Sequence, residues 1–196
     1  MRGSVTLLSL GPADYRRTPW RNGGGTTVDV AVETGAHGDV WRFGRTPIIR
    51  PGAFSDYSGF DRVQVLVSGR GLVLETPDGE IDVREPLRPV RFAGETPIVS
   101  RLEAGPVEVV NLIGDRARVG IDIQVLDAGR ALRVGPGTHI IYNPGGEGTL
   151  DVDGSAHHLP ADHALRLDGS GTAAMEARSG CFLLASIVRR GGTARP

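Results

Sequence analysis

Glycine and proline interrupt this chain so often that long helices have little room. The 196 residues include 29 glycines and 13 prolines, and both residue types break regular secondary structure. Short alternating or β-branched runs lie between these breaks, as at residues 62–67, 107–113 and 182–188. Turn sequences such as Pro77-Asp78-Gly79 and Asp153-Gly154 separate such runs. Many short strands at this spacing predict an all-β fold, either an antiparallel sandwich or a barrel.

A weak internal repeat predicts two β domains. Gly69-Arg70-Gly71 precedes a strand, a turn that ends in glycine and a second segment, and Gly146-Glu147-Gly148 precedes a similar succession. The two copies lie about half a chain length apart, as a duplicated unit requires. We therefore predict an N-terminal domain over residues 1–117 and a C-terminal domain over residues 118–190. A flexible tail is expected at residues 191–196.

The balance of charges argues against nucleic acid and membrane as direct partners. The chain has 22 basic and 23 acidic residues, and every basic residue is an arginine. Without lysine, Schiff-base chemistry is excluded. The single cysteine, Cys181, excludes an intramolecular disulfide. The chain opens on no signal peptide and has no apolar run of membrane-spanning length. We expect a cytoplasmic protein that is a monomer or a homodimer.

A run of three glycines, Gly23-Gly24-Gly25, is the most unusual local feature. Glycine loses the most conformational entropy on folding, and it lets another group approach the backbone closely. No Gly-Lys-Ser/Thr follows, and the glycine spacing is not that of a dinucleotide-binding loop. A plain loop between two strands is one interpretation. In the other, a small polar ligand finds stacking, charge and hydrogen bonds from the flanking side chains of Trp20, Arg21, Asn22 and Thr26.

The segment before Gly69-Arg70-Gly71 resembles the cupin jelly roll, in which two histidines and a glutamate bind a metal shortly before a strand that ends in Gly-x-Gly. Alignment on the glycines places Asp56, Ser58 and Arg62 at those ligand positions. Arginine cannot ligate a metal, because its guanidinium stays protonated and has no acceptor. The resemblance therefore implies an arginine at the usual metal seat, where it could bind a carboxylate bidentately.

A set of motifs resembles the HutD/Ves family in sequence, order and spacing, over roughly residues 1–115. The matching pieces are Asp14-Tyr15-Arg16, Pro19 to Thr27, Trp41-Arg42, Gly52 to Ser55, Gly59 to Arg62, and Asn111. The second half matches only as a divergent cupin-like barrel. Three departures could alter ligand choice. Asp29 stands where a glutamate is usual, Gly44 and Thr46 replace the small residues that are usual after Trp-Arg, and Tyr57-Ser58-Gly59 replaces the usual Phe-Pro-Gly.

The family resemblance implies a metal-free bicupin, which has two cupin-like jelly-roll β-barrels in one chain and no cofactor. One branch of the family is linked to histidine utilisation, where it is associated with limiting expression of the pathway. A ligand such as N-formylglutamate or urocanate is implied for that branch. The resemblance thus implies a protein that binds a small carboxylate metabolite and has a regulatory role, rather than an established enzyme.

We predict the ligand site in the N-terminal domain. Arg62 is expected to clamp the carboxylate with help from Arg42, while Asn111 and the amides of the glycine loop fix its orientation. The predicted ligand-binding residues are Trp20, Asn22, Gly23, Gly24, Gly25, Thr26, Arg42, Ser55, Asp61, Arg62 and Asn111.

Two other functions stay open at the level of sequence. One is a metal-independent isomerase or hydrolase that acts on a small carboxylate with Asp61 or Asp56 as the base, although no nucleophile motif accompanies these residues. The other is a module that binds another protein.

A histidine cluster, His157, His158 and His163, is a candidate metal site. Adjacent histidines on a strand face opposite sides, and no glutamate follows at cupin spacing. We therefore favour a solvent-exposed strand and loop, and we predict no metal.

Overall fold

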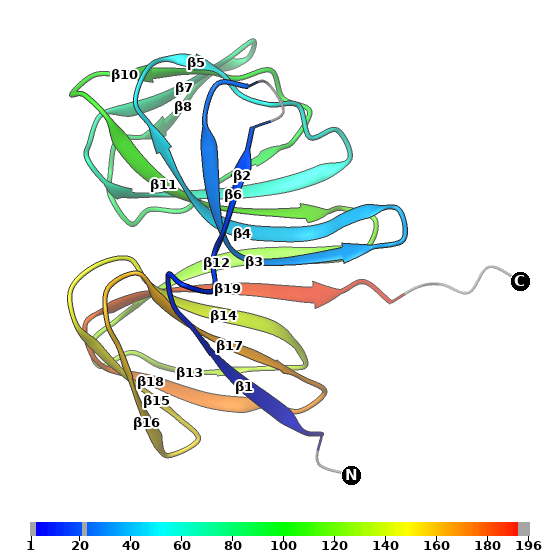
Figure 1. The fold of residues 1–196 in the computed structure, drawn as a ribbon, viewed down its shortest axis with the longest axis vertical. Coiled ribbons are helices and arrows are strands. Elements are labelled where there is room, and N and C mark those ends of the chain that lie inside the picture. Colours follow the sequence, from blue (N-terminus) through cyan, green and yellow to red (C-terminus); the bar gives the residue numbers. More distant parts are fainter. Residues whose placement is uncertain (1–2, 21–22, 192–196) are drawn as a thin grey trace, which may run out of the picture. The chain divides into compact units, whose positions relative to one another are not determined.

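The computed structural model describes residues 3–20 and 23–191, and within them it is built from strands alone (Figure 1). The predicted all-β class is therefore confirmed. Among the described residues, no helix has the length and hydropathy to span a membrane. The predicted ligand residue Asn22 and positions 192–196 of the predicted tail lie outside the described residues.

The chain divides into two compact units, which we call the N-terminal unit (residues 15–20, 23–121 and 190–191) and the C-terminal unit (residues 3–14 and 122–189). The predicted boundary at 117/118 is therefore corrected to 121/122, inside strand β12 (Val119–Asp127). Strand β1 (Val5–Leu10) also leaves the predicted N-terminal domain, because it pairs with β17 (His163–Gly169). A pairing over so long a separation leaves no mark in the local sequence pattern.

The N-terminal unit contains two antiparallel sheets. The six-stranded sheet has, in spatial order, β2 (Arg16–Pro19), β3 (Thr26–Gly35), β4 (Gly38–Ile48), β11 (Val107–Asp115), β6 (Phe60–Ser68) and β9 (Val90–Ala93). The four-stranded sheet has β5 (Gly52–Ala53), β10 (Val99–Leu102), β7 (Leu72–Thr76) and β8 (Gly79–Val83).

Apolar side chains from both sheets of the N-terminal unit form one buried cluster. Leu66 on β6 and Val109 on β11 belong to it together with Leu72 and Leu74 on β7. Successive side chains on a strand point to opposite faces. The face of β6 that carries Leu66 therefore also carries Gln64 and Arg62, and the inner face of the six-stranded sheet changes from apolar to polar along its strands.

The C-terminal unit repeats this plan. Its five-stranded sheet has the order β1, β17, β14 (Gly137–Asn143), β19 (Cys181–Arg189) and β12. Its four-stranded sheet has β13 (Ala131–Val134), β18 (Ala173–Ser179), β15 (Gly148–Val152) and β16 (Ser155–Leu159). Adding eight to each strand number turns β5-β10-β7-β8 into β13-β18-β15-β16, and β4-β11-β6-β9 into β12-β19-β14-β17. The repeat expected from the glycine pattern is thus present in the strand order.

None of the four sheets closes into a barrel within the described residues. Every sheet keeps two edge strands, such as β2 and β9 in the six-stranded sheet or β5 and β8 in its partner. Closure would require hydrogen bonding between such edges. The structure thus has two pairs of open sheets, each with an apolar core between its sheets, and the predicted pair of barrels is not confirmed.

Candidate ligand-binding site

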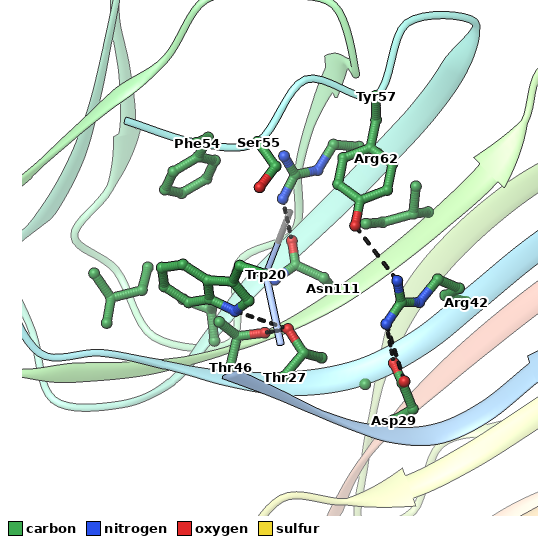
Figure 2. A pocket seen from close by; sticks show the side chains of 14 residues that line it. Trp20, Thr27, Asp29, Arg42, Thr46, Phe54, Ser55, Tyr57, Arg62 and Asn111 are labelled. Carbon is green, nitrogen blue, oxygen red and sulfur yellow. Dashed lines mark hydrogen bonds and ion pairs between the residues drawn. The ribbon is translucent and has the colours of Figure 1, made fainter. Parts of the chain in front are cut away.

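A pocket opens on the inner face of the six-stranded sheet, within the N-terminal unit (Figure 2). Its space is about 580 Å³ with the open mouth included. Strand alternation brings its floor together, since β4 contributes Arg42 and Thr46 and β11 contributes Val109, Asn111 and Ile113. The remaining described lining residues are Trp20, Thr27, Asp29, Gly44, Ile48, Phe54, Ser55, Tyr57 and Arg62.

Arg62 is the buried cation of this pocket. It is 7% exposed, and its Nη2 donates a hydrogen bond to Asn111 Oδ1 at 3.1 Å. Its Nε is buried and has no hydrogen-bond partner. Three aromatic rings surround the guanidinium, with centroids at 4.9 Å for Phe92, 5.1 Å for Phe54 and 5.6 Å for Tyr57. These contacts are favourable, but they leave donor groups of the guanidinium unpaired.

Within the part of the chain that the structure describes, no carboxylate pairs with Arg62. Burial lowers the pKa of Arg62 to about 10, because a low-dielectric surrounding disfavours the charged form. The side chain therefore still carries its charge at neutral pH. A buried charge without a counterion is costly, so an anion that enters the pocket would remove a cost already present in the free protein.

Arg42, by contrast, already has a partner. Its Nη2 donates to both carboxylate oxygens of Asp29, at 2.8 and 2.9 Å. Asp29 is 3% exposed and also accepts a hydrogen bond from Thr18 Oγ1. Nη1 of Arg42 donates to the Tyr57 hydroxyl at 3.5 Å, and Figure 2 shows Tyr57 between the two guanidinium groups. The predicted helper of Arg62 is thus engaged in a buried ion pair.

Trp20 forms another wall of the pocket. Its indole Nε1 donates to Thr27 Oγ1 at 3.1 Å, and Thr27 shares a 2.9 Å hydrogen bond with Thr46 Oγ1. Gly25 makes this possible, because a Cβ at residue 25 would lie 2.9 Å from two carbons of the indole ring. This glycine therefore allows the close approach of the Trp20 side chain.

The glycine run closes the turn between β2 and β3. Gly23 has a φ of 70°, a value that glycine adopts easily. Its amide donates to Trp20 O at 3.0 Å, and the Trp20 amide donates to Gly25 O at 2.9 Å. Gly23, Gly24, Gly25 and Thr26 are not among the described lining residues. Their predicted contact with the ligand through backbone amides stays a prediction without support from the pocket.

Five predicted residues do converge on the pocket: Trp20, Arg42, Ser55, Arg62 and Asn111. Sequence reasoning missed Asp29, Thr27, Thr46, Phe54 and Tyr57 as lining residues. The period of two along a strand could have found Thr46 from Arg42. Gly44 lies between them, and a Cβ at residue 44 would lie 2.5 Å from Val28 O. Because residue 44 has no Cβ, β3 can lie this close to β4, and Asp29 on β3 can line the pocket.

The two candidate catalytic bases lie elsewhere. Asp61 accepts a hydrogen bond from Arg116 Nε at 2.6 Å, and Asp56 accepts from the amide and hydroxyl of Ser58, both at 2.8 Å. Neither is among the described lining residues of the pocket. The predicted ligand contact of Asp61 and the enzyme interpretation therefore gain no support from the geometry.

The histidine cluster does not converge on one point. His158 Nε2 lies 3.0 Å from Glu147 Oε2 on an exposed surface, whereas His163 Nδ1 bonds to Ala161 O at 3.0 Å. No group of three or more potential metal ligands occurs among the described residues. At Arg62, which the alignment on Gly69-Arg70-Gly71 predicts to occupy the cupin metal position, the guanidinium offers donors and a positive charge, which does not fit a metal cation.

Comparison with known proteins places these features in a family. The HutD family model matches residues 12–185. An uncharacterized 21.2 kDa protein from the hutC 3' region of Pseudomonas putida is 28% identical over 190 residues, covering 94% of this chain and 98% of that protein. Protein Ves of Escherichia fergusonii is 31% identical over 100 residues, covering 49% of this chain and 52% of that protein.

Solved structures match the whole chain. HutD from Pseudomonas fluorescens SBW25, a structure described as a formate condition, has a TM-score of 0.82 at 28% identity and covers 95% of this chain and 100% of that one. More distant structures of cupin-like fold have TM-scores of 0.60 to 0.62 at 8 to 10% identity. Likeness at that level of identity concerns the fold alone.

Proposed function

This chain belongs to the HutD family, and from that membership and the pocket we propose that it binds a small carboxylate metabolite. The observation that carries the proposal is Arg62, a buried guanidinium for which the described residues supply no carboxylate. Charge-assisted hydrogen bonds of arginine to a carboxylate contribute about 1.5–3 kcal/mol each. Apolar and aromatic walls around a few polar groups are typical of small-molecule sites.

The ligand enters, in this proposal, with its carboxylate against Arg62. Asn111 Oδ1 holds one nitrogen of the guanidinium and thereby fixes its plane. Ser55 lies beside the guanidinium (Figure 2) and can donate its hydroxyl hydrogen to a bound carboxylate. Trp20 and Phe54 supply flat apolar surface for the body of the ligand.

Histidine utilisation supplies the context of the proposal. The family, the relative from the hutC 3' region and the solved HutD protein support an association with that pathway. N-formylglutamate and urocanate are the candidate ligands, and the role is regulatory: occupancy of the pocket reports the level of a pathway metabolite. The bicupin arrangement inferred from the sequence is part of this proposal.

A thermal-shift panel tests the proposal. Formate, urocanate, N-formylglutamate and glutamate are added to the wild-type protein, to Arg62→Met and to Arg88→Met. Arg88 is a matched control, since its side chain is 62% exposed and its ion pair with Glu85 is a surface contact. At least one carboxylate should raise the melting temperature of the wild type and of Arg88→Met but not of Arg62→Met. If no carboxylate stabilises the wild type, or if Arg62→Met responds equally, the proposal is wrong.

A further inference from the structure

The charged side chains that line the pocket differ in whether a described residue of opposite charge pairs with them. Its described lining residues include three charged side chains, Asp29, Arg42 and Arg62. Asp29 and Arg42 neutralise each other through two hydrogen bonds of 2.8 and 2.9 Å. Arg62 keeps its charge unmatched by any described residue, because its one hydrogen bond goes to the neutral amide of Asn111.

Two further charged residues lie near the Asp29–Arg42 pair, and they do not change the net charge around the pocket. Arg16 approaches Asp29 at 3.8 Å, and Asp39 approaches Arg42, also at 3.8 Å. These two outer residues have opposite signs. Together with the inner pair they leave the described surroundings of the pocket with a single positive charge in excess, located at Arg62.

The rest of the described lining offers no further cation for a second negative group. Ile48, Phe54, Val109 and Ile113 are apolar, and Trp20 Nε1 already donates to Thr27. A second ligand carboxylate would have to lie near Asp29, which repels it, or take Arg42 away from Asp29 and leave a buried carboxylate unpaired. Both arrangements are unfavourable in a poorly solvated pocket.

We propose that Asp29 sets the charge of the ligand. By neutralising Arg42 it leaves Arg62 as the single cation without a carboxylate partner among the described lining residues, so the pocket selects a monocarboxylate with an uncharged body over a dicarboxylate. This selectivity rests on the proposed function and deepens it. Of the two candidate ligands it favours urocanate, which has one carboxylate, over N-formylglutamate, which has two. Asp29 acts through Arg42 and excludes a competitor, since specificity is a difference between two affinities. It is therefore a specificity-determining residue that need not touch the ligand.

Calorimetric titration with matched probes tests the selectivity in the wild-type protein. Glutarate carries two carboxylates, whereas monomethyl glutarate has the same chain and one charge, and valerate has one carboxylate and an apolar end. Monomethyl glutarate and valerate should bind at least about tenfold more tightly than glutarate. Equal or tighter binding of glutarate overturns the inference, and it does so without any variant that must fold.

Substitution then assigns the selectivity to Asp29. In Asp29→Asn the described surroundings of the pocket gain a second positive charge in excess, because Arg42 loses its close carboxylate partner and keeps only that of Asp39, at 3.8 Å. The affinity for glutarate should therefore rise at least about tenfold relative to that for valerate. Asp82→Asn is the matched control, because Asp82 is 58% exposed and pairs with Arg84 outside the pocket; it should keep the wild-type ratio. Asp29→Glu retains the charge and should retain the preference for valerate. An unchanged ratio in a folded Asp29→Asn protein overturns the role of Asp29.

Carboxylate binding and charge selection can be tested separately. If valerate binds, is lost in Arg62→Met, and glutarate binds equally well, carboxylate binding by Arg62 stands and only the charge selection is wrong. If none of the three probes binds to the wild type, and no carboxylate of the thermal-shift panel raises its melting temperature, the proposed function itself is wrong.

Discussion

Arg62 and Asn111 meet diagonally across strands β6 and β11. The register places Arg62 opposite Ile113 and Gln64 opposite Asn111, so the 3.1 Å bond from Arg62 Nη2 to Asn111 Oδ1 spans neighbouring rows of the sheet. A neutral amide therefore stands where an ion pair would need a carboxylate. The pocket keeps a charged donor that is held in place without being neutralised.

Asn111→Asp should abolish carboxylate binding. The new side chain has almost the same shape, but it places a negative charge at the oxygen that now accepts from Arg62, and it becomes the internal counterion that a ligand would otherwise provide. We expect affinity for valerate to fall by at least about tenfold, which corresponds to 1.4 kcal/mol. Calorimetry measures the loss. Asn111→Ser, which removes the amide without adding charge, should bind more tightly than Asn111→Asp; the reverse order would show that the amide itself, and not neutrality, is required.

Gly25→Ala should disturb Trp20. The added Cβ would lie 2.9 Å from two indole carbons, so the ring must move and its bond to Thr27 Oγ1 is weakened. Overpacking of this kind costs about 1–3 kcal/mol. Tryptophan fluorescence and chemical denaturation measure the two effects. Gly52→Ala is the control, since no atom lies within 4 Å of a Cβ at that position, and it should leave the emission spectrum unchanged.

Gln64→Met should stabilise the protein. Gln64 is 0% exposed, and both polar atoms of its carboxamide are buried without a hydrogen-bond partner among the described residues. Leaving such groups unpaired costs about 1–3 kcal/mol, and methionine has a similar volume. The free energy of unfolding, measured with urea, should rise by a similar amount. Gln124→Met, at an exposed position, should have little effect, and destabilisation by Gln64→Met would contradict the prediction.

His139 should make the stability depend on pH. Burial is the largest influence on this residue and lowers its pKa from 6.5; the ring is also held by Ser186 Oγ at 2.9 Å and Gly135 O at 3.0 Å. The unfolded chain therefore binds the proton at a higher pH than the folded one. The contribution of His139 to the free energy of unfolding is fully present above the pKa of the unfolded chain, which is about 6.5. It decreases as the pH falls below that value toward the lower pKa of the folded protein. Denaturation curves at a series of pH values should show this fall, and His139→Gln should reduce it, whereas the exposed His37→Gln should not.

Local patterns predicted the strands and five of the fourteen described lining residues of the pocket. The alternation in residues 62–67 places Arg62 on a strand, and five predicted residues meet at one pocket. The pairing of Arg42 with Asp29 could not be predicted, because the β3–β4 register shifts between Asp29 and Ala31. An irregularity of that kind moves a side chain to the other face of a sheet. Membership of β1 in the C-terminal unit likewise depends on a partner far along the chain.

The repeated strand order places Arg62 and His139 at equivalent positions in the two units, and substitutions at these positions should have different effects. Arg62 is the third residue of β6, and His139 is the third residue of β14, the strand eight numbers later. Both are buried polar residues. His139 bonds to Ser186 and Gly135 of its own unit, whereas Nε of Arg62 has no hydrogen-bond partner among the described residues. In a duplicated fold, the polar residue at this position can therefore be satisfied within its own unit in one copy and remain available to a ligand in the other. Natural variation at the histidine should show itself as altered protein abundance, and variation at the arginine as altered response to a metabolite at unchanged abundance.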